Sequence, residues 1–122
     1  MTSDEYVKGI LQQIADACTL LEHIKDNPGD LEIIKRESAR ITGLFSALSN
    51  KLSANKHEFS DYQHLVTPMR AYLNDHDFTR EIEMLSALYS EDSMRLKNLR
   101  LTILDALSEK NLIGHIHSIL RE

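Results

Sequence analysis

Apolar residues recur at helical spacing along the chain, and the longest pattern lies in residues 77–113, which contain neither Gly nor Pro. Two rows of apolar residues there, seven apart, face one side of a helix. They are Ile82, Tyr89, Leu96 and Ile103 in one row, and Phe78, Leu85, Leu99 and Ala106 in the other. The pattern predicts one long helix from Asp77 to Glu109, about 50 Å in length at about 1.5 Å per residue.

Two shorter patterns precede it near the start of the chain. Thr2 and Glu5 have the spacing of a capping box and predict a first helix that runs to about Lys25. The turn Asn27-Pro28-Gly29-Asp30 follows, with Asp30 as the expected N-cap of a second helix that ends near Leu52. The short connection makes these two helices an antiparallel hairpin.

A third apolar stripe follows a polar loop. Ser60 and Gln63 have the spacing of a second capping box, and Pro68 either kinks this helix or begins it. The polar segment 74–77 is expected to reverse the chain into the long helix. Residues 112–120 predict a short terminal helix with one apolar face.

These patterns define a fold class. No stretch shows the period-two alternation of a β-strand, so the chain is predicted to be all-α. We expect an elongated antiparallel helical bundle with three to four main helices, one of them long, and a short C-terminal helix. Its 122 residues suffice for one core, so residues 1–122 are expected to form a single domain.

Composition narrows the classes of partner. A net charge of −5 without a basic stripe argues against nucleic-acid binding, and the cluster of Arg95, Lys97 and Arg100 is read as a solvated helix face. Cys18, the only cysteine, lies on an apolar stripe, which favours a buried thiol over a catalytic one. The acidic start and the lack of any membrane-spanning run favour a soluble cytoplasmic protein that does not insert into membranes.

Six histidines make metal binding and phosphotransfer the enzyme-like alternatives. His57-Glu58-Phe59-Ser60-Asp61 approximates a zinc-protease motif, but its last ligand is Asp and its first residues are expected in a loop. His115 and His117 would point about 200° apart on a helix. For phosphotransfer, His23 lies near a helix end and His64 has no Lys or Gly beside it. We therefore expect no catalytic, cofactor-binding or metal-binding residues, and no enzyme.

The predicted long helix has a second apolar face away from its buried one. Its members are Ala87, Met94, Leu101 and Leu104. Asp92 interrupts the buried row. Either the helix bends there and the carboxylate is exposed to solvent, or Asp92 contacts a partner or sets the register of helix packing. The terminal segment, a second copy of the chain or a foreign helix would cover this second face. The residues of the terminal segment that would mask it are Leu112, Ile113, Ile116, Ile119 and Leu120.

The segment Thr67-Pro68-Met69-Arg70-Ala71-Tyr72-Leu73-Asn74-Asp75 and the stretch from Glu37 to Leu48 resemble the FliT-type flagellar export chaperones. The resemblance implies a non-enzymatic chaperone that binds a secretion substrate or a regulator through its helices. We therefore expect a protein-binding module, a bacterial secretion chaperone or regulator, whose partner is a helical segment or a second copy of the chain. The alternative binding function is that of an acidic inhibitor or immunity-type protein that covers a basic site.

Overall fold

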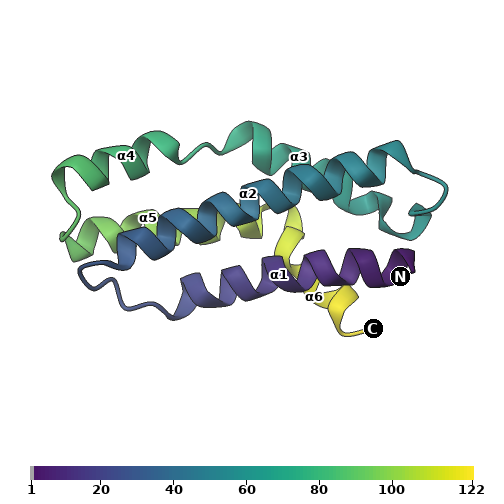
Figure 1. Ribbon diagram of the computed structural model, residues 1–122, viewed down its shortest axis with the longest axis horizontal. Coiled ribbons are helices and arrows are strands. Elements are labelled where there is room, and N and C mark those ends of the chain that lie inside the picture. Colours follow the sequence, from purple (N-terminus) through teal and green to yellow (C-terminus); the bar gives the residue numbers. More distant parts are fainter. Residues whose placement is uncertain (1) are drawn as a thin grey trace.

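Helices make up the regular structure of the computed structural model, which describes residues 2–122, and no strand occurs in that part of the chain. The elements are α1 (Ser3–His23), α2 (Asp30–Ala54), the 3₁₀ helix η1 (Ser60–Leu65), α3 (Val66–Asp75), α4 (Thr79–Leu88), α5 (Ser93–Ser108), the 3₁₀ helix η2 (Glu109–Asn111) and α6 (Leu112–Leu120). They form an elongated antiparallel bundle, which confirms the predicted all-α fold (Figure 1). None of these helices is both long enough and apolar enough to span a bilayer.

The hairpin of α1 and α2 forms as predicted, with one difference at its turn. Thr2 caps α1 by accepting a hydrogen bond at Oγ1 from the Glu5 N–H, at 3.1 Å. At α2 the N-cap is Gly29, with a φ of +94° that favours glycine. The prediction that Asp30 is the N-cap is wrong, because Asp30 is the first helical residue and its carboxylate accepts from the Asn27 N–H at 2.8 Å.

The predicted single long helix is wrong, since α4 ends at Leu88 and α5 begins at Ser93. The chain reverses between them, so that α4 and α5 lie antiparallel (Figure 1). Asp92 is the N-cap of α5, and its Oδ1 accepts hydrogen bonds from the N–H groups of Met94 and Arg95, both at 3.1 Å. A helix that continued through Asp92 would place this carboxylate in the buried row, whereas the turn leaves it exposed.

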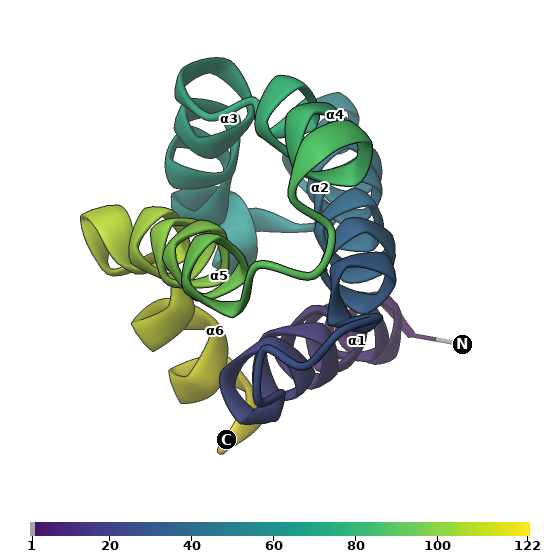
Figure 2. The ribbon, with the colours of Figure 1, turned by 90° about the vertical axis from the view of Figure 1, so that its left-hand side faces the viewer.

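The bend at residues 76–78 replaces the reversal that was predicted at 74–77. After α2, the chain returns along it first as α3 and then as α4. These two helices share one general direction, which is opposite to that of α2 (Figures 1 and 2). The Asp77 carboxylate accepts a hydrogen bond from the Thr79 N–H at 3.0 Å, which satisfies one of the free donors at the start of α4. The pair α3 and α4 therefore takes the place of one continuous helix alongside α2.

The start of α3 also differs from the prediction. Gln63 does not pair with Ser60 in a capping box; its side-chain amide donates to the carbonyls of Leu52 and Phe59 at 2.9 and 3.2 Å. Pro68 lies in the first turn of α3, directly after η1, where its missing N–H breaks no helical hydrogen bond.

The core lies between the antiparallel helices (Figure 2). Both apolar rows of the predicted long helix contribute to it, because the reversal lets α4 and α5 turn their rows inward. Ile82, Leu85, Leu96, Leu99, Ile103 and Ala106 are buried, and Phe78 and Tyr89 are partly buried against them. The rows were thus identified correctly, although the helix that carries them is broken.

A buried ion pair joins the turn after α1 to the middle of α5. Arg100 donates from Nε and Nη2 to the two carboxylate oxygens of Asp26, at 2.8 and 2.9 Å, and from Nη1 to the Leu21 carbonyl at 3.2 Å. The side chains of Arg100 and Asp26 are 11% and 9% exposed. The expectation that Arg100 lies on a solvated face with Arg95 and Lys97 is wrong, because Arg100 points at the C-terminal end of α1. Hydrogen bonding to Asp26 raises the pKa of Arg100.

We expect Arg100→Met to lower the free energy of unfolding by about 3 kcal/mol, because it leaves the Asp26 carboxylate buried without its partner. Arg95→Met is the matched control, since Arg95 is 47% exposed and pairs with Asp92 at 3.4 Å. It should cost less than about 1 kcal/mol. Urea unfolding followed by circular dichroism measures both. Equal losses in the two variants would contradict a structural role for the buried pair.

Candidate functional site

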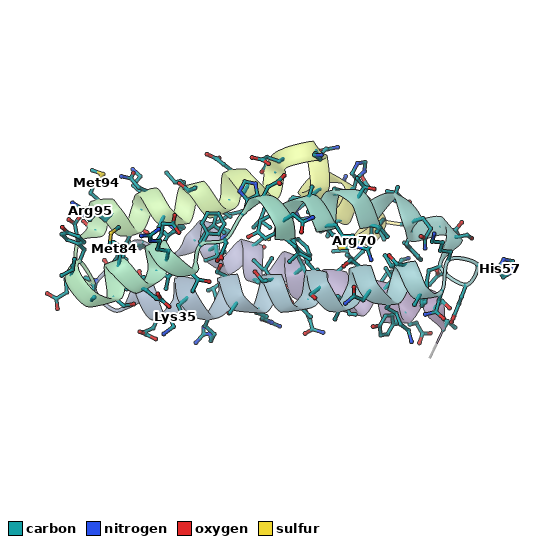
Figure 3. The ribbon with its side chains drawn as sticks, turned by 90° about the horizontal axis from the view of Figure 1, so that it is seen from above. Lys35, His57, Arg70, Met84, Met94 and Arg95 are labelled. Atoms are coloured by element: carbon teal, nitrogen blue, oxygen red, sulfur yellow. The ribbon has the colours of Figure 1, made fainter. Side chains whose placement is uncertain are left out.

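Large apolar side chains gather on the outside of α4 and α5. Within residues 2–122 the exposed large apolar residues are Leu20 (37%), Met84 (46%), Leu88 (70%), Met94 (63%) and Leu101 (40%). All but Leu20 lie on α4 or α5. Figure 3 shows Met84 and Met94 on these two neighbouring helices at the same end of the molecule. We refer to Met84, Leu88, Met94 and Leu101 as the hairpin surface.

A shallow groove of about 260 Å³ separates α4 from α5 within this region. Its floor includes Leu85 and Leu99, which are buried, and Met84 lies at its edge. Glu81 of α4 and Arg95 of α5 supply charged groups at the rims. An apolar floor between charged rims is suited to side chains that project from one face of a helix.

The turn between α4 and α5 is held by contacts within the chain. The Arg95 guanidinium lies 3.7 Å from the ring centre of Tyr89, a cation–π contact. Asp92 uses Oδ1 for the backbone of α5 and Oδ2 for Arg95. Of the two alternatives for Asp92, the structure shows the break in the helix with a solvent-exposed carboxylate, which caps α5; contact of Asp92 with a partner stays a prediction.

The structure sorts the residues predicted for the second apolar face. Ala87, Met94 and Leu101 are exposed, whereas Leu104 is half-buried and packs against the core. Met84 and Leu88 were missed, because they do not fall on the seven-residue row of Ala87, Met94 and Leu101. Their spacing of four residues, one helical turn apart, was visible in the sequence.

The terminal segment does not mask the hairpin surface. In the structure α6 packs against α1 and the C-terminal part of α5, on the side of the bundle away from the α4–α5 turn (Figure 1). Met94 and Leu101 are exposed while α6 is in place, so the predicted masking is wrong. Leu112, Ile116 and Ile119 are buried and Ile113 and Leu120 are half-buried, which makes α6 part of the core.

A second, larger groove of about 690 Å³ lies on the other side of α4, between α2 and the bend at residues 76–78. Leu73, Phe78 and Ile82 form its apolar side. The His76 ring stacks on Phe78 with ring centres 6.0 Å apart, and its Nε2 lies 2.9 Å from a carboxylate oxygen of Glu109. Phe78 borders both grooves, so α4 is a ridge with a groove on each side.

In the part of the chain that the structure describes, the histidine rings are not hydrogen-bonded to hydroxyl or thiol side chains. The zinc-protease-like segment lies in and after the loop that follows α2, where Glu58 accepts a hydrogen bond from the Ser3 hydroxyl at 2.8 Å. No three His, Cys, Asp or Glu side chains of residues 2–122 are grouped so as to enclose a metal ion.

Cys18 is buried in α1, as predicted. Burial, assisted by the negative charge of Glu22, raises the pKa of its thiol to about 12. The thiol is therefore protonated and unreactive in the folded chain near neutral pH. Because the folded pKa exceeds that of the unfolded chain, this thiol favours folding below about pH 9, and the contribution is lost as the pH rises toward 12.

We expect Ellman's reagent at pH 8 to label Cys18 only as fast as the folded chain opens. The same chain unfolded in urea, as the control, should react within seconds, because its thiol is accessible and has an ordinary pKa. Rapid stoichiometric labelling of the folded chain would contradict the burial of Cys18.

No protein-family model, curated protein or solved structure matches the chain.

We expect Asp92→Ala to lower the free energy of unfolding by about 1 kcal/mol, because two N–H groups at the start of α5 lose their acceptor. Asp105→Ala is the control, since Asp105 is an exposed residue of α5 that caps no helix. It should change stability by less than about 0.5 kcal/mol. Unchanged stability and increased helicity in Asp92→Ala would show that α4 and α5 can join into one helix.

Proposed function

We propose that the chain is a non-enzymatic protein-binding module that holds a helical segment of a partner on the hairpin surface. The observation that carries this proposal is the concentration of exposed Met84, Leu88, Met94 and Leu101 on two adjacent helices beside an apolar groove. Exposed apolar residues that occur singly need no explanation, whereas four of the five large exposed apolar side chains of residues 2–122 fall on this one pair of helices, a concentration that favours an interaction site.

The size of the surface predicts a reversible complex. Fully burying a Leu or Met side chain contributes roughly 1.5–3 kcal/mol. The four side chains are between 40% and 70% exposed, so that covering them supplies about half of that amount each, or roughly 3–6 kcal/mol in total. Association costs at least about 4 kcal/mol, and further contacts in the groove must supply the remainder. Binding of this kind suits a partner that is held and then released.

The side chains of this surface favour an adaptable binding mode. Met84 and Met94 are unbranched and flexible, so they can fit differently shaped apolar faces. A secretion chaperone or regulator in a bacterium is the specific form of the proposal. It is supported by the resemblance of residues 37–48 and 67–75 to the FliT-type chaperones. These residues lie in α2 and α3 of the bundle.

The test compares two leucines of nearly equal exposure, Leu101 on the hairpin surface and Leu20 on α1. A photo-crosslinking amino acid is placed at Met94 or at Leu20 in cells of the native source, and adducts are identified by mass spectrometry. Leu101→Asp should reduce crosslinking from position 94 by at least about tenfold, because a charge cannot enter an apolar contact. Leu20→Asp should leave that crosslinking unchanged.

Other results would contradict the proposal. If Leu101→Asp unfolds the chain, Leu101 belongs to the core, and Leu88→Asp, at the most exposed position of the hairpin surface (70%), then serves as the second variant. Crosslinks to a second copy of the chain, with sedimentation as a dimer, would identify the hairpin surface as a homodimer interface. A complex that dissociates at high salt and is insensitive to Leu101→Asp would indicate the acidic inhibitor instead.

A further inference from the structure

Two histidines that are distant in sequence meet across the junction of η1 and α6. The rings of His64 in η1 and His115 in α6 lie edge to face, with centres 5.4 Å apart and planes at 75°. His64 is exposed and His115 is half-buried, so both rings can be reached from solvent. In the sequence, His57 lies near His64, and His115 lies near His117. The fold instead brings His64 next to His115.

The spacing of these rings is that of two ligands on one metal ion. A Zn²⁺ ion lies about 2.1 Å from a ligating imidazole nitrogen, and hence about 3 Å from the ring centre. Two imidazoles on one tetrahedral ion therefore have ring centres about 5 Å apart. The separation of 5.4 Å between the ring centres of His64 and His115 is close to this value, so rotation of the two side chains out of the edge-to-face arrangement brings one nitrogen of each ring to a shared ion.

The surroundings of the pair also favour a cation. His64 and His115 line a cavity of about 400 Å³ that also contains Asp4, Asp61 and Glu122, with Lys8 as the single basic group. The Tyr62 hydroxyl donates to the Asp4 carboxylate at 2.7 Å and holds it at the cavity wall. The three carboxylates outnumber the one ammonium group in the lining of this cavity, so these side chains give it a net negative charge, which attracts cations.

We propose that His64 and His115 bind a borderline divalent metal ion of the Zn²⁺ type, with water completing its coordination. Imidazole ligands select Zn²⁺, Ni²⁺ or Cu²⁺ over Mg²⁺ and Ca²⁺, which prefer oxygen. No third protein ligand is in place within residues 2–122, so the site is weaker than a structural zinc site. Because the ion bridges η1 and α6, its binding fastens the C-terminal helix to the body of the bundle.

The experiment uses the full chain and ZnCl₂ at pH 7.5, with titration calorimetry and thermal unfolding as two measurements. We expect one Zn²⁺ per chain, and at saturation a rise in Tm of about 4 °C or more. EDTA should reverse the rise. MgCl₂ at the same concentration should have no effect, because the carboxylates alone do not form the site. The proposal does not depend on the hairpin surface or on any partner.

Two pairs of variants separate the site from adventitious binding to surface histidines. His64→Gln and His115→Gln should each abolish the heat of binding and the rise in Tm. His117→Gln, on the same helix, and His57→Gln, in the exposed loop (Figure 3), should bind Zn²⁺ as the unaltered chain does. His64 is exposed, so His64→Gln remains informative even if His115→Gln fails to fold. Unaltered binding by His64→Gln, or an equal loss in His117→Gln, would overturn the proposal.

Discussion

The bidentate ion pair between Asp26 and Arg100 fixes the relation of the α1–α2 hairpin to the rest of the bundle. A guanidinium and a carboxylate that are nearly excluded from water tolerate little displacement, because either group alone would be strongly destabilising. Arg100 also donates to the carbonyl of Leu21 in the last turn of α1. The position of α5 along α1 is thereby set at one point, from which the hairpin surface extends one way and α6 the other.

Sequence periodicity predicted the burial of the helices better than their ends. The rows containing Ile82, Leu96 and Ile103 are buried, and the terminal helix occupies residues 112–120 as predicted. The break at residues 89–92 was missed because Tyr89 and Leu96 keep the heptad spacing across it. The local signal was the run Ser90-Glu91-Asp92-Ser93, in which Asp92, a favoured N-cap residue, lies between two serines that form helices less readily than Ala or Leu.

The two proposed binding sites were harder to predict from the sequence, because each one depends on contacts between separate elements. Met94 and Leu101 were identified from one helix face, but Met84 joins them only after the chain reverses. The sequence alone places Arg100 on the surface, because nothing in it shows that Asp26 lies opposite Arg100 in the fold. In the same way, His64 and His115 are unrelated in sequence and become neighbours only when α6 packs against the body of the bundle.

The ridge formed by α4 has a consequence for local stability. This helix buries only Ile82 and Leu85 and has a groove on each side, whereas α5 is held by Arg100 and by several buried apolar residues. Local opening of α4 therefore requires less free energy than global unfolding, and its amide protons are expected to exchange with solvent before those of α5. On the proposal that a helix binds in this groove, a bulky occupant widens the groove by displacing α4, while α5 stays in place.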